Sequence, residues 1–532
     1  MRHLAFPLSY NPGQKSTEIS LWKKLSKNGG RRVENLDTPP GGQYTWPTHE
    51  GRQFVPMKVE TTVLLTILIP IIGSFAVPLA GLVGRSVRSA WSVLVAAATA
   101  VLPLSLLPFA LEGGELVTRR TLAMGFDFVL VVDPLSIFMA AVSSFIGFLI
   151  VVYSLGYVRR EDNQSEYYLM VVLFIGAMMG LVFSGNLIFI YLFWEIIAIA
   201  CWRLIGFYRE PDHVRKADKA FLLTFFGAVV MLLGFVQIFG VTNTFDITAM
   251  RGTVVPGTAV LLILFGLFSK SATIPLHTWL PDAGVAPTTV TALLHAAVLV
   301  KIGVYAFARL FIYTFRIPEG WQEAIPILVV VSSLVAAGAA AVENDLKRIL
   351  AYSTISQIGY IFLGFSMMNA AGVSGSLLFI LMHGLAKAGL FLCAGIVIHA
   401  VHTKDIREMG GLIRTMPVTA VAFLVCAFSV IGIPPFGGFF SKFLVILATV
   451  QAGQVWLAAI ALFTAVLTMY YLFKVFHLVF LGEAKRPAPE KTKSMVYVVA
   501  VLAVLSLAAG LFVAYPMKLV NVATTQMSWW LR

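Results

Sequence analysis

Apolar runs of membrane-spanning length recur along most of the sequence, and they constrain its fold more than any other feature. A helix of about 20 apolar residues crosses the hydrocarbon core of a bilayer. Of the 532 residues, 58% are hydrophobic and 12% are charged, whereas soluble proteins carry about 25% charged residues. The sequence therefore predicts an all-α, multi-pass membrane protein.

About fourteen transmembrane helices are predicted from these runs, joined by short loops. The predicted spans are 60–83, 90–111, 127–157, 167–184, 186–208, 219–243, 256–278, 286–314, 324–342, 347–369, 375–401, 417–450, 455–482 and 494–516.

Basic residues gather in one set of alternate loops, which predicts that this set is cytoplasmic. The net charge of +13 therefore indicates loops that face anionic lipid, and we expect no nucleic-acid partner. The basic loops hold Arg85, Arg88, Arg159, Arg160, Arg209, Arg215, Lys216, Lys219, Lys347, Arg348, Lys404, Arg407, Arg414, Lys485, Arg486, Lys491 and Lys493. The opposite loops hold Arg119, Arg120, Arg251 and Arg316.

The N-terminal residues 1–56 are polar and include the basic segment KKLSKNGGRR at 23–32. They lack the apolar core of a secretory signal, and we expect them to be disordered or docked on a surface. Met57 directly precedes the first span, so two interpretations stay open: a native extension, or a chain that starts at Met57. An even helix count places 23–32 outside, against the charge rule, which favours Met57 as the start.

Two segments, 167–314 and 324–482, each hold five predicted helices. An odd number of helices per copy inverts the second copy in the membrane. The fourth helix of each copy is interrupted by proline and carries a lysine: Lys270 before Pro275, and Lys442 after Pro434 and Pro435. The predicted domains are 1–58 (extension), 59–158 (three helices), 159–315 (inverted repeat one), 316–482 (inverted repeat two) and 483–532 (last helix and tail).

The stretch from Phe268 to Tyr305 carries two lysines, Lys270 and Lys301, in apolar surroundings that prolines interrupt. A charge at the bilayer centre costs about 2.5–3.5 kcal/mol, and a proline frees a carbonyl that needs another partner. This combination predicts a polar path through the membrane. The alternative is that either lysine extends to the interface from a helix end.

Glu195 lies within the apolar segment IYLFWEIIAIACW. A carboxylate there needs a cation or a proton, so we expect a role in proton movement; a static ion pair is the alternative. A membrane-buried lysine can load and release a proton, and a carboxylate that moves or changes protonation would alter its occupancy.

Four further residues complete the predicted path. His295 is a candidate proton carrier, with a hydrogen-bonded structural histidine as the alternative. His383 and Lys387 are four residues apart, share one helix face and would link the two half-channels. Lys442 would be the ionisable group on the exit side, with a lipid-facing lysine as the alternative.

The cysteines Cys201, Cys393 and Cys426 are far apart and lie in apolar runs. Their spacing matches no disulfide, zinc or iron–sulfur pattern, so we expect small buried residues and no cofactor. A haem- or quinone-binding redox subunit is the least favoured alternative, because bis-histidine haem needs paired histidines on facing helices.

Five motifs in a fixed order resemble one family of membrane subunits. They are FSKSATIPLHTWLPDAGVAPTTVTALLHAAVLVKIGVY, ENDLKRILAYSTISQIGY, MHGLAKAGLFLCAG, HTKDIREMGGL and IPPFGGFFSKF. They resemble the antiporter-like subunits of respiratory complex I, membrane-bound hydrogenases, archaeal sulfur-reducing complexes and multi-subunit sodium/proton antiporters, over roughly residues 60–515.

The resemblance implies fourteen helices with two inverted five-helix repeats. It gives Glu195 the role of the fifth-helix glutamate, paired with Lys270, and Lys301 that of the eighth-helix lysine. His383 and Lys387 resemble the central pair, and Lys442 is the basic variant at the second broken helix.

We therefore expect a proton-translocating subunit, with Na⁺ as the alternative ion, of a complex I-like or hydrogenase-like complex in a prokaryotic cell membrane. The chain itself would be non-redox. Its expected partners are related antiporter-like and small membrane subunits, a peripheral iron–sulfur arm, and lipids. The alternatives are a subunit of a multi-subunit Na⁺/H⁺ antiporter, and a stand-alone transporter of cations or inorganic carbon.

Overall fold

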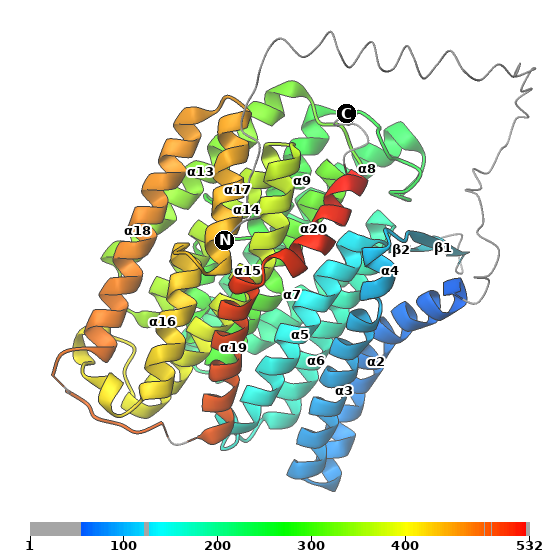
Figure 1. Ribbon diagram of the computed structural model, residues 1–532. Helices are drawn as coiled ribbons and strands as arrows, with labels where there is room; N and C mark the ends of the chain where they lie inside the picture. The colour runs from blue at the N-terminus through cyan, green and yellow to red at the C-terminus, as the bar shows by residue number, and fades with distance from the viewer. Residues whose placement is uncertain (1–54, 122–126, 484, 491, 528–532) are drawn as a thin grey trace, which may run out of the picture. The chain divides into compact units, whose positions relative to one another are not determined.

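The computed structural model describes residues 55–121, 127–483, 485–490 and 492–527, and this part is helical apart from one hairpin (Figure 1). The predicted extension 1–58 lies almost wholly outside the described residues. The elements before the first repeat are α2 (Val55–Val83), α3 (Arg85–Ser105), α4 (Leu107–Leu111), β1 (Leu116–Thr121), β2 (Asp127–Val132) and α5 (Pro134–Tyr157).

The rest of the described chain continues as helices. Repeat one holds α6 (Gln164–Phe183), α7 (Leu187–Ile205), α8 (Pro211–Thr242), α9 (Gly257–Lys270), α10 (Trp279–Asp282), η2 (Ala283–Val285), α11 (Thr288–Ala292), η3 (Leu293–Ala297), α12 (Leu299–Phe307) and η4 (Ala308–Ile312). Then follow α13 (Glu319–Val342), α14 (Leu346–Ser366), α15 (Ala370–Val401), η5 (Ile406–Glu408), η6 (Leu412–Arg414), α16 (Pro417–Ile431), α17 (Gly437–Gln451), α18 (Val455–Phe480), α19 (Lys493–Leu511) and α20 (Ala514–Met527).

The prediction of an all-α membrane protein is confirmed. In the part that the structure describes, 12 helices are long and apolar enough to cross a membrane. Three shorter apolar helices, α9, α16 and α17, belong to the two predicted spans that proline interrupts. The count of fourteen crossings and the predicted domain boundaries remain predictions.

The predicted span 127–157 is wrong at its start, because residues 127–132 form a strand. In the antiparallel hairpin, Leu116 pairs with Val132 and Thr121 with Asp127. The helix begins only after Asp133, whose carboxylate accepts a hydrogen bond from Ser136 N–H at 2.8 Å, while Ser136 Oγ accepts from Asp133 N–H at 2.9 Å. This capping box starts α5, and an apolar run such as DFVLVV suits a strand as well as a helix.

The two predicted repeats share one backbone pattern in register. In repeat one, Leu187 N–H donates to Phe245 O, and in repeat two Leu346 N–H donates to Lys404 O. Leu346 is equivalent to Leu187, and Lys404 to Phe245, because in both cases the residue numbers differ by 159 (346 minus 187). Helices α8 and α15 have 32 residues each and keep this offset at both ends. Four non-glycine residues with positive φ fall into equivalent pairs: Arg209 with Met368, and Asn243 with His402.

The second copy runs in the opposite direction. Lys219, near the start of α8, and Arg348, near the start of α14, both bind the carboxylate of Asp282 at 2.7 and 2.9 Å. Helix α14 therefore starts beside the start of α8. Helix α7 instead starts beside the end of α8, where Asn186 bridges Asp246. Equivalent helices thus begin at opposite ends of the bundle, as in transporters with inverted repeats.

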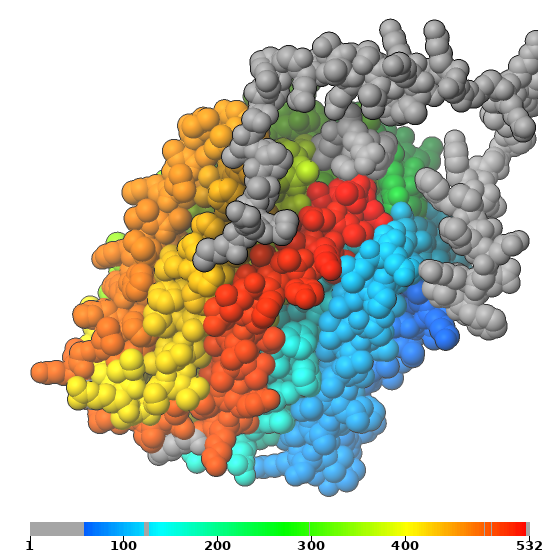
Figure 2. Space-filling view, viewed as in Figure 1, coloured from blue at the N-terminus to red at the C-terminus, as the bar shows by residue number. Residues whose placement is uncertain are grey.

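Helices α19 and α20 fill the seam between the first helices of the chain and repeat two (Figure 2). Three contacts hold α20 there. Gln526 Nε2 donates to Gly113 O at 2.7 Å, Tyr313 Oη donates to Ala523 O at 3.1 Å, and the hydroxyls of Ser374 and Thr524 lie 3.0 Å apart. The tail predicted after the last span is therefore a docked helix over Ala514–Met527.

Candidate functional site

The first broken helix places Lys270 in the interior. Helix α9 ends at Lys270, and α10 does not begin until Trp279. Lys270 is fully buried; its Nζ donates to Trp194 O at 3.2 Å and lies 5.4 Å from the centre of the Trp194 ring. A helix end frees carbonyls, and Trp279 Nε1 donates to that of Ser269 at 2.9 Å. The break is therefore capped by an indole, and the ammonium of Lys270 is not needed for this.

Glu195 is the residue next to Trp194 on α7, so the structure brings the predicted partners Glu195 and Lys270 together. They form no direct ion pair, because no carboxylate oxygen of Glu195 lies within 4.0 Å of Lys270 Nζ. Glu195 is half-buried, and its Oε1 is buried without a hydrogen-bond partner among the described residues. An unpaired buried oxygen calls for a water or a proton, so this site is suited to a change of charge.

His295 lies on a π-helical turn, η3, and Lys301 follows on α12. Such widened turns are frequent at functional sites. Both residues are fully buried, and Lys301 Nζ donates to Ala296 O. The imidazole of His295 stacks on Phe391 with ring centres 4.4 Å apart, and neither ring nitrogen has a partner among the described residues.

Helix α15 brings the central residues to this group. A methyl group added to Gly384 would lie 3.2 Å from Lys301 Nζ, so Lys301 lies against α15 beside His383. The imidazole of His383 is fully buried, and both its nitrogens lack partners in the described chain. Lys387, one turn later, donates to Ser353 Oγ at 2.6 Å and to Leu350 O at 3.2 Å. Lys301, His383 and Lys387 thus meet at the centre of the bundle.

The second broken helix differs from the first. Helix α16 ends at Ile431, and α17 carries Lys442 after the break. Lys442 Nζ donates to Val430 O at 2.8 Å and to Ile431 O at 3.2 Å. It also lies 4.7 Å from the centre of the Tyr360 ring. The ammonium therefore caps the carbonyls that the break frees. Because Lys442 is only 4% exposed, the alternative of a lysine that faces lipid does not apply to it.

Sequence reasoning missed two polar groups. Tyr471 Oη donates to Ser353 Oγ at 2.7 Å, and Gln357 Nε2 donates to Thr468 Oγ1 at 3.2 Å. Both pairs join α14 to α18 beside Lys387. Hydroxyl and amide residues are common in membrane helices, so their type alone did not single them out.

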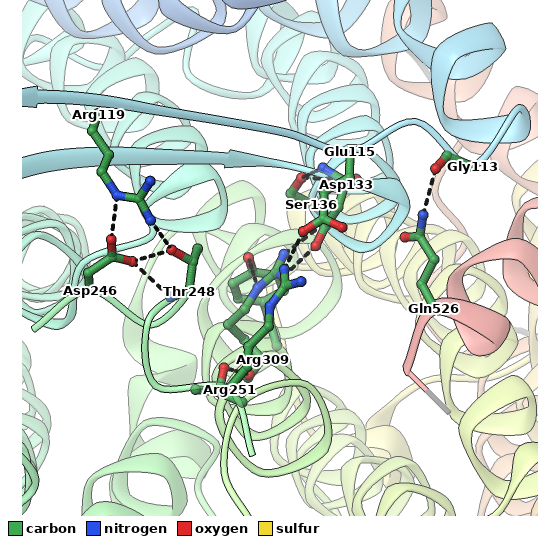
Figure 3. Close-up of polar contacts among 12 residues, drawn as sticks. Gly113, Glu115, Arg119, Asp133, Ser136, Asp246, Thr248, Arg251, Arg309 and Gln526 are labelled. Atoms are coloured by element: carbon green, nitrogen blue, oxygen red, sulfur yellow. Dashed lines mark hydrogen bonds and ion pairs between the residues drawn. The ribbon is translucent and has the colours of Figure 1, made fainter. Parts of the chain in front are cut away.

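A buried ion pair between Asp133 and Arg309 was also missed (Figure 3). Arg309 Nη2 donates to Asp133 Oδ1 at 2.9 Å, and both side chains are 2% exposed. Burial acts to raise the pKa of Asp133, but the Arg309 guanidinium and Ser136 outweigh it and hold this pKa below its ordinary value. Both residues lie near helix ends, where charges are ordinary, so the sequence did not draw attention to them.

Figure 3 also shows Glu115, Arg251 and Gln526 around the same position. Together with Asp133 and Tyr313 they line a cavity of about 20 Å³, at the end of the bundle predicted to face outward. Nearby, Arg119 pairs with Asp246 at 2.7 Å and thereby fixes the hairpin to the loop that ends α8.

Five described lysines are at most 4% exposed. Four of them, Lys270, Lys301, Lys387 and Lys442, are the lysines of the predicted path. The fifth, Lys347, which was predicted to lie in a cytoplasmic loop, is buried at the start of α14 and donates to Ala286 O at 2.8 Å. Within the described residues, none of these lysines has a carboxylate oxygen within 4.0 Å. Each of the four lysines of the predicted path donates to one or two backbone carbonyls, and Lys387 also donates to the hydroxyl of Ser353. A buried cation without a counter-charge is costly, so each amine can give up its proton with little loss of contacts.

The chain is similar to known membrane subunits by sequence. Residues 184–468 match the family described as "NADH:quinone oxidoreductase/Mrp antiporter, TM", and residues 121–168 match "NADH-Ubiquinone oxidoreductase (complex I), chain 5 N-terminus". NAD(P)H-quinone oxidoreductase subunit 5, organellar chromatophore 1, of Paulinella chromatophora is 37% identical over 374 residues, 66% of this chain and 55% of that protein. Na⁺/H⁺ antiporter subunit A1 of Staphylococcus haemolyticus is 31% identical over 504 residues, 87% of this chain and 63% of that protein.

Two solved structures share the fold. The Mrp complex from Dietzia sp. DQ12-45-1b contains a chain with TM-score 0.76 and 24% identity, covering 89% of this chain and 96% of that one. The archaeal membrane-bound sulfane sulfur reductase contains a chain with TM-score 0.79 and 25% identity, covering 87% of this chain and 97% of that one.

The chain spans 55% and 63% of the length of the two curated relatives. It belongs to the NADH:quinone oxidoreductase/Mrp antiporter family of membrane proteins.

Proposed function

We propose that the chain translocates protons as an antiporter-like subunit of a larger complex in the cell membrane. The observation that carries this proposal is that the four lysines of the predicted path, Lys270, Lys301, Lys387 and Lys442, are buried and have no carboxylate partner within the described residues. They extend from one broken helix to the other, with His295 and His383 between them. Each of these lysines donates to at least one acceptor but has no fixed counter-charge within the described residues, so its charge can change during transport.

The unpaired imidazoles support water in this path. Both ring nitrogens of His295 and His383 are buried without partners among the described residues. Buried polar groups are nearly always hydrogen-bonded to protein or ordered water. We infer that water bridges these rings to the lysines and that protons pass along Glu195, Lys270, Lys301, His295, His383, Lys387 and Lys442.

The proposed partners follow from the names of similar proteins. One relative is a subunit of an NAD(P)H-quinone oxidoreductase, another a subunit of a Na⁺/H⁺ antiporter, and one structure is a sulfane sulfur reductase. The proposal therefore includes companion membrane subunits. The proposal also includes a peripheral iron–sulfur arm as a partner and Na⁺ as a second transported ion.

The first experiment is affinity purification of the native chain with identification of its companions and metals. Iron–sulfur companions support a redox-driven complex, and small cofactor-free membrane subunits support a cation/proton antiporter. A chain that purifies alone and still transports ions contradicts the shared-complex proposal.

The second experiment tests the proton path itself. Glu195→Gln removes a charge next to Lys270 and should lower proton pumping in vesicles at least tenfold while the complex still assembles. Glu319→Gln is the matched control, because Glu319 is exposed at the start of α13. Normal pumping in the Glu195 variant would remove this residue from the path.

A further inference from the structure

A large basic cavity lies at the end of the bundle predicted to be cytoplasmic, away from the buried lysines. Its volume is about 960 Å³. The ends of α3, α5, α15 and α19 surround it, and they meet at the bottom of Figure 1. The polar lining comprises Arg85, Tyr157, Arg159, Arg160, Glu161, His399, His402, Thr492 and Ser494.

The arginines of this cavity lack partners. Of the 16 arginines that the structure describes, ten form ion pairs. Of the six that do not, three line this cavity: Arg85, Arg159 and Arg160. Their guanidinium groups also make no hydrogen bond to the described residues, and Glu161 is the one carboxylate in the described lining. Three guanidinium groups around one space leave an excess of positive charge.

Part of the cavity wall is apolar. Leu155 and Ile396 line it on the membrane side of the arginines, and Met495 lines it from α19. Gly156 allows α5 to approach the segment before α19, since a methyl group there would lie 2.6 Å from Thr492 Cγ2. The carboxylate of Glu490 accepts from Thr419 N–H at 3.1 Å and from Thr419 Oγ1. This contact fixes the segment to α16, so the cavity is built from anchored elements.

We propose that this cavity binds a phosphate group, carried either by an anionic phospholipid or by a soluble phosphate. Arginine forms paired hydrogen bonds to phosphate oxygens, and basic pockets between transmembrane helices bind anionic lipid head groups at the cytoplasmic side. The apolar residues behind the arginines are suited to an acyl chain. The proposal does not depend on proton translocation by the buried lysines.

The test compares the intact chain, purified with its native companions, with a variant that combines Arg159→Gln and Arg160→Gln. Both side chains are exposed and form no ion pair or hydrogen bond with the described residues. Arg414→Gln is the matched control, since Arg414 is exposed and unpaired among the described residues but lies outside the cavity lining. The probes are cardiolipin, phosphatidylcholine and inorganic phosphate, followed by native mass spectrometry and by the thermal unfolding midpoint.

Each arginine near a lipid head group contributes about fivefold in affinity, so the double variant should bind cardiolipin about 25-fold more weakly. Arg414→Gln should bind it normally, and phosphatidylcholine should bind weakly to all three proteins. That result assigns the site to lipid. If inorganic phosphate shows the same arginine dependence and cardiolipin does not, the ligand is a soluble phosphate.

Two results would overturn the proposal. One is that the binding of cardiolipin and of inorganic phosphate does not depend specifically on Arg159 and Arg160, either because the double variant binds both probes normally or because Arg414→Gln weakens binding equally. The other is that crosslinking from Thr492 recovers an acidic segment of a companion protein in this cavity. The Arg85→Gln variant gives an independent check, because Arg85 comes from a different helix and should also weaken binding about fivefold.

Discussion

The two broken helices use a lysine in different ways. In the first break, Trp279 Nε1 caps the carbonyl of Ser269, and Lys270 contacts Trp194 O on the neighbouring helix. In the second break, Lys442 itself binds the freed carbonyls of Val430 and Ile431. Lys270 therefore does not cap its own helix break, whereas Lys442 hydrogen-bonds to the carbonyls that the second break frees. Equivalent architecture thus does not imply equivalent energetics at the two sites.

The largest expected effect separates the lysines by stability. Lys442→Met leaves two buried carbonyls unpaired, each at a cost of about 1–3 kcal/mol, so the free energy of unfolding should fall by about 2–6 kcal/mol. Lys270→Met removes one long hydrogen bond and a buried charge, so its change should stay below about 1 kcal/mol. Thermal unfolding of the two variants in detergent measures both losses of stability. Equal losses in the two variants would mean that the breaks are energetically alike.

The transport activities of the same variants sharpen this comparison. Both should lose proton pumping, because each removes an ionisable group from the proposed path. Lys442→Arg keeps a donor for the carbonyls and should restore stability without restoring pumping. If it instead restored pumping to the original rate, Lys442 would not need to release a proton.

An intermediate effect is expected at the cap of the first break. Trp279→Phe removes the Nε1–H that binds Ser269 O and should destabilise the chain. Trp194→Phe is the matched control, because Trp194 Nε1 has no partner among the described residues and the loss of volume is the same. The difference between the two variants should be about 1–2 kcal/mol. If Trp194→Phe lowers the free energy of unfolding as much as Trp279→Phe does, the loss of side-chain volume, and not the loss of the cap, explains the destabilisation.

The smallest effect concerns Ser353, which occupies in repeat two the position of Trp194 in repeat one (353 minus 194 is 159). Ser353→Ala removes an acceptor from both Lys387 and Tyr471, and we expect a loss of about 1 kcal/mol. Thr354→Ala on the same helix is the control, since its hydroxyl bonds only to Leu350 O. A larger loss in the control would contradict a role for Ser353.

The buried lysines could be predicted from the sequence because a charge in an apolar run stands out at any position. Prolines likewise predicted where α9 and α16 end. Asp133 and Arg309 could not be predicted, because a charged residue near a helix end is normally solvated, and only the fold shows that these two meet. The hairpin was missed because β2 is as apolar as a helix. The absence of a direct Glu195–Lys270 ion pair depends on side-chain placement, which sequence spacing does not determine.

The offset of 159 residues between the inverted copies has a consequence for the direction of transport. A scaffold made of two matching halves in opposite orientation looks much the same from either side of the membrane. Such a scaffold has no preferred direction of its own. Any asymmetry must come from the many positions where the halves differ, among them Glu195 against Thr354, Trp194 against Ser353, and Ala228 against Lys387. Under the proposed function, exchanging these side chains between the halves tests whether they set the direction in which protons move.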